Sequence, residues 1–149
     1  MSGNARSQVM QLWMRLLALA LVCFSPITQD ATALMPMPLF DTVWSWHSTL
    51  APDGSRTPVS SPERYTLQLL REGTVRVRAD CNRGSGTYRS SDVELHFDRV
   101  AVTKRGCAAG SRGREFLAAL DRVESYRFEG IDLLAVAGGA TLRFRPLAP

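Results

Sequence analysis

Apolar and polar residues alternate along most of the chain after the first forty or so positions, a pattern typical of strands that bury one face. The first alternating run, residues 42–49, places Trp44 and Trp46 on the same face. Residues 65–70 and 74–80 alternate in the same way on either side of a short turn. These two runs therefore predict a β-hairpin with a clear inside and outside.

The same pattern predicts further short strands and one helix. Phe116, Leu120 and Val123 recur at helical spacing, so they predict a helix that lies on the sheet, with Ser111 as its N-cap. A surface loop with turn residues is expected over residues 50–62. The remaining strands are expected at 87–89, 93–97, 99–104, 125–128, 131–136 and 142–145.

Short connections between strands require antiparallel neighbours, and about eight such strands curl toward a barrel. We therefore predict a mainly β (α+β) fold: a strongly curved antiparallel sheet or half-open barrel with one α-helix packed against it.

The densest cluster of turn-forming residues lies between the expected hairpin and the strand that follows it. It contains Cys81, Asn82, Gly84 and Gly86 and ends at Tyr88. Glycine reaches backbone angles with φ > 0 at no steric cost, and asparagine tolerates them. The stretch therefore predicts a tight strand–turn–strand corner, with the strand restarting near Tyr88.

The first 33 residues predict an export signal. A basic start is followed by an apolar run over residues 16–24, a proline, and a small-x-small cleavage site that ends at Ala33. The apolar run is far shorter than the roughly 20 residues of a membrane-spanning helix. Cys23 leaves a lipid anchor as an alternative, but bulky Val22 beside it disfavours lipidation. We expect a periplasmic or secreted protein with a linker over 34–39 and one domain over 40–149.

Cys81 and Cys107 are the two cysteines that remain after signal removal, because the chain has three in all. An oxidising compartment favours their pairing, which would tie the sheet to the helix and contribute about 3–4 kcal/mol of stability. Two free buried thiols are the alternative. A zinc site is disfavoured because the chain has no CxxC motif and only two histidines.

The distribution of charge along the chain bears on the kind of partner that is expected. Loss of Arg6, Arg15 and Asp30 with the signal lowers the formal charge by one from +4, and acids are interspersed with the arginines, so no nucleic-acid partner is expected. Arg76 and Arg78 fit an anionic partner, although a solvated sheet face is the simpler interpretation.

Neither histidine suggests catalysis. His96 has no second histidine at ligand spacing and is expected to be exposed, and His47 lies in the first strand, with no GxSxG motif in the chain. We therefore expect no enzymatic activity and no cofactor or metal.

Aromatic residues recur on the expected strands and have two interpretations. They fill a core, or they line the lip of a ligand cavity; a filled core is the simpler interpretation because barrels of about eight strands can be packed solid. The residues concerned are Trp44, Trp46, Tyr65, Phe97 and Phe144.

The spacing of Cys81-Asn82, Gly86 and Tyr88 resembles the CN-x-x-x-G-x-Y signature of META domains, the group that includes the heat-shock protein HslJ. The later order is also similar: Trp44 in the first strand, Thr103-x-x-x-Cys107, the helix with Phe116, Leu117 and Leu120, and then Ser125-Tyr126-Arg127. Two positions depart from the family pattern. Many members have a glycine just before the first cysteine, where this chain has Asp80. Many have a methionine or alanine just before the second cysteine, where this chain has Gly106.

The resemblance implies a small β fold with lipocalin-like curvature, exported to the periplasm or outer envelope, with no agreed catalytic residues. We accordingly expect an exported, non-enzymatic protein of the bacterial cell envelope, a monomer that acts in protein interaction or stress tolerance through an unidentified envelope partner. The alternatives are a binder of a small apolar ligand in the curved sheet and an inhibitor of an envelope protease, which would present the loop over residues 50–62.

Overall fold

The computed structural model describes residues 38–147. The predicted export signal, its cleavage site, Cys23 and most of the expected linker lie outside the described residues. Pro38 and Leu39 are the linker residues that are described, and Leu39 belongs to the hydrophobic core. It also accepts a hydrogen bond from Trp44 Nε1 at 3.1 Å through its carbonyl oxygen. The packed domain therefore begins before residue 40.

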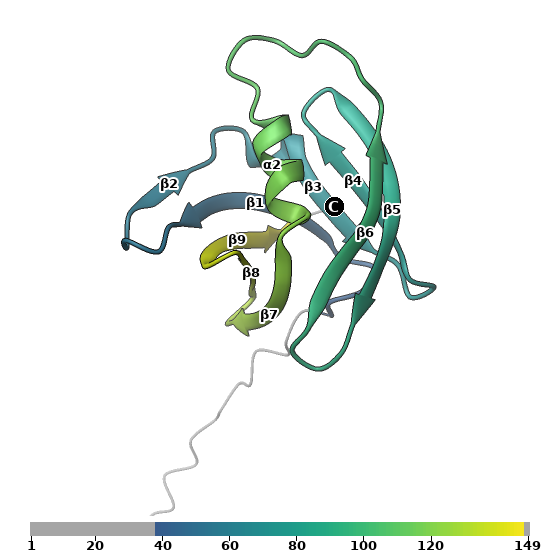
Figure 1. The fold of residues 1–149 in the computed structure, drawn as a ribbon, viewed down its shortest axis with the longest axis vertical. Helices are drawn as coiled ribbons and strands as arrows, with labels where there is room; N and C mark the ends of the chain where they lie inside the picture. The colour runs from purple at the N-terminus through teal and green to yellow at the C-terminus, as the bar shows by residue number, and fades with distance from the viewer. Residues whose placement is uncertain (1–37, 148–149) are drawn as a thin grey trace, which may run out of the picture. The chain divides into compact units, whose positions relative to one another are not determined.

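Nine strands and one α-helix make up the described part of the chain (Figure 1). The strands are β1 (Val43–Leu50), β2 (Arg56–Pro58), β3 (Tyr65–Leu69), β4 (Thr74–Ala79), β5 (Asn82–Ser90), β6 (Leu95–Val102), β7 (Val123–Glu129), β8 (Asp132–Ala137) and β9 (Ala140–Pro146). The helix is α2 (Gly113–Leu120), and a short 3-10 turn, η1 (Pro62–Arg64), precedes β3.

The strands form one antiparallel sheet in the order β6-β5-β4-β3-β1-β9-β8-β7, with β2 paired to β1 beside this path. The two terminal strands of the order, β6 and β7, meet at a single bridge between Glu94 and Ser125. There Tyr126 donates its backbone N–H to the carbonyl oxygen of Val93 at 2.8 Å. The sheet is thus a half-barrel, as predicted, and α2 lies over its open side.

Aromatic side chains from the strands and the helix fill the inside of the half-barrel. Phe116 of α2 stacks on Trp46 with ring centroids 5.4 Å apart, and it also contacts Tyr65 and Phe144 at 6.0 and 6.2 Å. Trp44, Trp46, Phe116 and Phe144 are fully buried. Since large aromatic side chains bury the most apolar area, this cluster holds the helix on the sheet.

Two predictions about β5 and β6 were wrong. Gly84 and Gly86 are not turn residues, because β5 begins at Asn82 and runs through both of them. The turn is made instead by Asp80 and Cys81, with Asp80 at φ 65°. The expected strands 93–97 and 99–104 are one strand, β6, which continues through a bulge where Arg99 has φ 52°.

Three further predictions need smaller corrections. The helix ends at Leu120, and Val123 begins β7 instead of extending the helical stripe. Ser111 is not the N-cap, which is Arg112, but its Oγ accepts a hydrogen bond from the backbone N–H of Gly113 at 3.3 Å. The expected loop over 50–62 contains β2 and the buried Val59, so it is attached to the sheet and not free.

Candidate functional site

A groove lies between β6 and α2, beneath the loop that joins them. Its volume is about 970 Å³. Figure 1 shows this loop arching from the end of β6 to the start of α2. We call residues 103–112 the arch. The floor and walls come from the end of β6, the arch and α2, and they include Val100, Val102, Lys104, Arg105, Ala109, Arg114 and Leu117.

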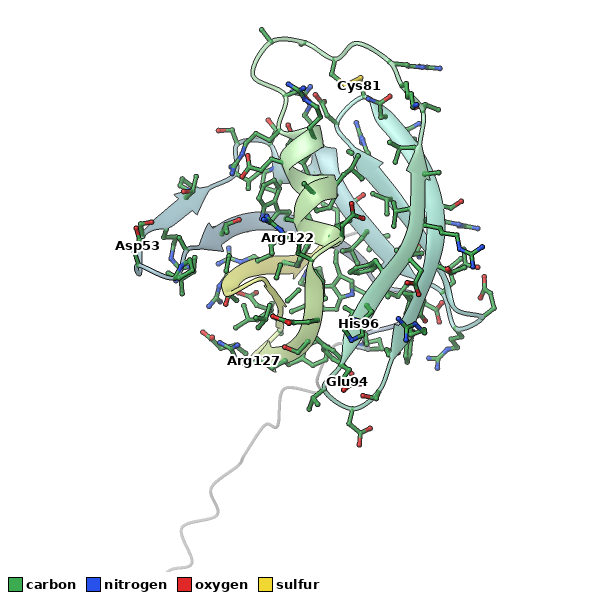
Figure 2. The ribbon with its side chains drawn as sticks, viewed as in Figure 1. Asp53, Cys81, Glu94, His96, Arg122 and Arg127 are labelled. Carbon is green, nitrogen blue, oxygen red and sulfur yellow. A yellow bond between two sulfur atoms is a disulfide. The ribbon has the colours of Figure 1, made fainter. Side chains whose placement is uncertain are left out.

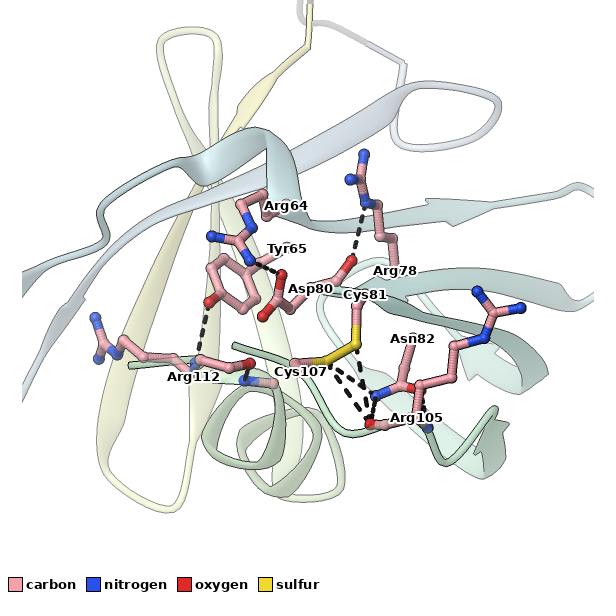
Figure 3. Close-up of polar contacts among 11 residues, drawn as sticks. Arg64, Tyr65, Arg78, Asp80, Cys81, Asn82, Arg105, Cys107 and Arg112 are labelled. Carbon is pink, nitrogen blue, oxygen red and sulfur yellow. Dashed lines mark hydrogen bonds and ion pairs between the residues drawn. A yellow bond between two sulfur atoms is a disulfide. The ribbon is translucent and has the colours of Figure 1, made fainter. Parts of the chain in front are cut away.

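A disulfide fastens the arch to the corner between β4 and β5. Cys81 and Cys107 are bonded through their sulfurs, with Cα atoms 5.6 Å apart, which is the pairing expected from the sequence. Cys81 is exposed and Cys107 is half-buried. The bond therefore links two surface segments (Figure 3). One of them, the arch, lines the groove.

Asn82 clamps the arch by hydrogen bonds made at both ends of its side-chain amide. Its Oδ1 accepts from the backbone N–H of Arg105 at 2.7 Å and from Thr103 Oγ1 at 2.9 Å. Its Nδ2 donates to the carbonyl oxygen of Arg105 at 3.1 Å and to Cys107 Sγ at 3.3 Å. An aliphatic residue here would leave these arch groups unpaired, which accounts for asparagine beside the cysteine.

The two glycines of β5 allow β6 to approach closely. A Cβ at Gly84 would lie 1.8 Å from the carbonyl oxygen of Ala101, and one at Gly86 would lie 2.8 Å from the Cα of Val100. Neither glycine has a positive φ. They are required for the space they leave to β6 and not for turn geometry.

Tyr88 has a structural role in the β3–β4 turn. Its hydroxyl donates to the carbonyl oxygen of Leu70 at 2.6 Å, and its backbone N–H donates to Gly73 at 3.0 Å. Burial, together with the nearby Glu72, raises the pKa of Tyr88 above its ordinary value, so the hydroxyl stays a donor at neutral pH. The motif residues therefore all stabilise the walls of the half-barrel.

Asp80 is held at the corner by contacts that offset its unfavourable backbone angle. Its carboxylate pairs with Arg64, and its backbone N–H donates to the carbonyl oxygen of Arg64 at 2.7 Å. The Ser111 hydroxyl and then the Arg64 guanidinium hold the pKa of this carboxyl below its usual range. Because φ is positive here, glycine would be the unstrained choice at this position.

Arg112 anchors the start of α2. Its guanidinium lies 4.5 Å from the centre of the Trp46 ring, bonds Glu115, and donates to the carbonyl oxygen of Pro58 at 2.9 Å. Its backbone N–H donates to Tyr65 Oη at 3.0 Å. The hydrogen bonds to Glu115 raise the pKa of Arg112, and Arg112 in turn lowers the pKa of the Glu115 carboxyl. One side chain thus joins the helix, β2 and the core.

The groove is apolar at its floor and positively charged at its rim. Val100, Val102 and Leu117 supply apolar surface, while Lys104, Arg105 and Arg114 line the groove with no carboxylate among the lining residues. The sequence carries a signal for this charge, because residues 99–114 contain five cations and no acid. The expectation of evenly interspersed acids is therefore wrong for this stretch.

The candidate aromatics belong to the hydrophobic core. Trp44, Trp46, Tyr65, Phe97 and Phe144 are all buried, and none of them lines the groove between β6 and α2.

The two histidines do not come together, since β1 and β6 have three strands between them in the sheet order. His96 is half-buried and not exposed as expected. It lies near Glu94 at the start of β6 (Figure 2). Burial and then the charge of Arg145 lower the pKa of His47, so its neutral form is favoured.

No helix within residues 38–147 is long and apolar enough to cross a bilayer. In that same part of the chain, no three His, Cys, Asp or Glu side chains gather into a set that could hold a metal ion.

Comparison with known proteins gives a family and a fold. The model of the META domain family matches residues 37–148. No curated protein matches the sequence. The NMR structure of a protein from Burkholderia xenovorans is similar over 83% of this chain and 99% of that one, with 25% identity and a TM-score of 0.62.

Two other solved structures show the fold alone. A DUF4847 family protein from Bacteroides vulgatus shares 14% identity, with a TM-score of 0.50 over 70% of this chain and 91% of that one. A further NMR structure shares 17% identity, with a TM-score of 0.53 over 70% and 88% of the two chains.

Proposed function

The chain belongs to the META domain family, and from that premise we propose that it is an exported, non-enzymatic accessory protein of the bacterial cell envelope. In this proposal it binds an extended segment of a partner protein in the groove between β6 and α2. Stress tolerance is the setting that we propose for the interaction. The observation that carries the proposal is the unpaired edge of β6 along this groove.

Among residues 38–147, β6 has a hydrogen-bonded neighbour on one side only over most of its length. It pairs with β5, and its other edge meets β7 only near Glu94. Thr103 donates its backbone N–H to Arg83 of β5, so its neighbours Val102 and Lys104 direct their backbone groups to the other side. Both line the groove. An unpaired edge is a template for strand addition, a recurring mode of peptide recognition.

The lining residues define the chemistry of the partner segment. Val102 and Leu117 favour apolar side chains that point into the groove. Lys104 and Arg114 favour a carboxylate at its rim, and such rim charges mainly raise the rate of association and the specificity. The segment we propose is therefore extended, apolar on one side and acidic on the other.

The disulfide supports the proposal of export, because such bonds persist outside the cytosol. It also holds the arch over the groove without contributing a catalytic group. A binding role needs no oriented pair of nucleophile and base, and the two histidines lie on β1 and β6, which have three strands between them in the sheet order.

Site-specific photocrosslinking in intact cells tests the proposal. A photoreactive residue at Ala109, in the groove, is expected to capture a discrete envelope protein. The matched control is Ala118, which is exposed on α2 but does not line the groove. Leu117→Asp should reduce the Ala109 product, because a charge would replace the apolar contact. Equal products from both positions would contradict the assignment.

A small apolar ligand is the second candidate, favoured by the volume of the same groove and its apolar floor. Native mass spectrometry of the purified protein separates the two, since a bound ligand adds mass that a peptide-binding protein purified alone would lack. No observation favours a protease inhibitor, because the expected reactive loop is held by the pairing of β2 with β1.

A further inference from the structure

A second groove lies on the outer face of the sheet, across β3, β4 and β5. Its volume is about 470 Å³, which falls in the range of small-molecule pockets. It shares no lining residue with the groove beneath the arch. Its lining residues are Val43, Thr66, Gln68, Arg76, Val77, Arg78, Arg83, Gly84 and Ser85.

Three arginines converge on this groove from two adjacent strands. Arg78 of β4 lies directly opposite Arg83 of β5, and Arg76 is two positions along β4 on the same face, opposite Ser85. Residues opposite each other in an antiparallel pair have Cβ atoms roughly 5 Å apart, and like charges there are destabilising. This arrangement therefore weakens the free protein unless an anion is bound.

No carboxylate offsets these charges within the described part of the chain. Six other arginines form ion pairs there: Arg64, Arg71, Arg89, Arg112, Arg143 and Arg145. Arg76, Arg78 and Arg83 form none. Arg78 Nε donates to the carbonyl oxygen of Asp80 at 3.1 Å, which orients that guanidinium and leaves its terminal nitrogens for another acceptor. Like charges placed opposite each other with no neighbouring carboxylate destabilise the sheet, and such an uncompensated cost is expected at a functional site.

We propose that this groove binds the phosphate group of a phosphate ester. Guanidinium groups form forked, charge-assisted hydrogen bonds with phosphate oxygens, and three of them match the oxygens of one such group. Thr66, Gln68 and Ser85 lie beside the arginines and offer uncharged polar groups to the alcohol part of the ester. Gln68 Nε2 is engaged with the Asp41 carbonyl oxygen at 3.0 Å, so its Oε1 remains to accept from a hydroxyl. This site is independent of the proposed peptide groove.

The test has two arms that distinguish a soluble ester from a lipid headgroup. In the first, the mature disulfide-bonded protein is titrated with glucose 6-phosphate and followed by amide NMR. In the second, it is sedimented with phosphatidylglycerol vesicles and, for comparison, with phosphatidylcholine vesicles. Arg83→Gln is compared with Arg127→Gln, which removes the same charge from an exposed position on β7 (Figure 2).

We expect saturable shifts at residues 76–85, or binding to the anionic vesicles only. Arg83→Gln should weaken that binding about tenfold or more, because a charge-assisted hydrogen bond is lost, and Arg127→Gln should not. Either arm with this dependence supports the site and identifies the source of the phosphate. No binding in either arm, or equal binding by both variants, would overturn the proposal.

The melting temperature of the free protein gives a second readout. Arg83→Gln removes one member of a like-charge pair, so it should melt at a higher temperature than the wild type while it binds phosphate less well. A lower melting temperature would assign Arg83 a structural role and count against the binding site.

Discussion

Replacing both Cys81 and Cys107 with alanine is expected to lower the free energy of unfolding by about 3.5 kcal/mol. The bond closes a loop with a sequence separation of 26 residues. Constraining a loop of that size in the unfolded chain gives about 3.5 kcal/mol from chain entropy at 25 °C. The free energy of unfolding of a small domain is about 5–15 kcal/mol, so the loss is a large fraction of the total stability.

Direct contacts add little to this figure, because Cys81 is exposed and Cys107 is only half-buried. The hydrogen bonds that join the Asn82 side chain to Thr103 and Arg105 do not depend on the sulfurs. The variant should therefore fold with its core intact, and its unfolded chain should be more expanded than that of the wild type.

Urea unfolding followed by tryptophan fluorescence measures the effect, since Trp44 and Trp46 are buried in the core. The slope against urea should also increase, because the unfolded chain without the crosslink exposes more surface. Reduced wild-type protein is the control and should match the variant. A loss below about 1 kcal/mol would refute the reasoning, since it would mean that the bond constrains little of the unfolded chain.

Three further predictions concern strand β5, the start of the helix and the loss of stability in acid. Gly84→Ala should destabilise the domain by roughly 2 kcal/mol or more, because the added Cβ would overlap β6. In the same urea assay Gly106→Ala should be close to neutral, because a Cβ there would meet nothing within 4 Å. Arg112→Ala should lower the free energy of unfolding by about 2 kcal/mol, because the cation–π contact with Trp46 and the hydrogen bonds are lost. The control is Arg114→Ala, at an exposed neighbouring position, which should have little effect. Equal effects of the two substitutions would contradict the anchor role of Arg112. The pKa of Asp80 is lowered in the folded state, so its contribution is present above about pH 4 and is lost as the pH falls through the folded pKa. Asp80→Asn should therefore lose stability at neutral pH and converge on the wild type in acid, and a constant difference across pH would exclude this linkage.

Local pattern was sufficient for much of this fold. The alternation of apolar and polar residues identified the hairpin of β3 and β4, and helical spacing identified Phe116 and Leu120 as the buried face of α2. The pairing of Cys81 with Cys107 followed from counting cysteines. These features depend on periods of two or 3.6 residues or on simple arithmetic, which a sequence displays directly.

Contacts between distant residues were not predictable in the same way. Gly84 and Gly86 are glycines because β6 presses against them, and nothing near them in the sequence distinguishes this role from a turn. The bulge at Arg99 likewise depends on its pairing with β5. Positive φ falls on Asp80 and not on Asn82, because the two-residue turn lies one step earlier than the motif suggested.

The candidate groove was missed because its parts are separated in the chain and meet only after folding. Val102 belongs to a strand, Lys104 to the arch and Leu117 to the helix. The acid-free run over residues 99–114 was visible in the sequence, but only the fold places its cations around one hollow.

Amide hydrogen exchange in a complex with the crosslinked partner tests the central claim most directly. If a partner segment adds to the free edge of β6, exchange at Val102 and Lys104 should slow in the complex relative to the free protein. Exchange in β8, which is paired on both sides in the free protein, should stay the same. Unchanged exchange along β6, with protection elsewhere on the surface, would contradict the assignment of the groove as the binding site.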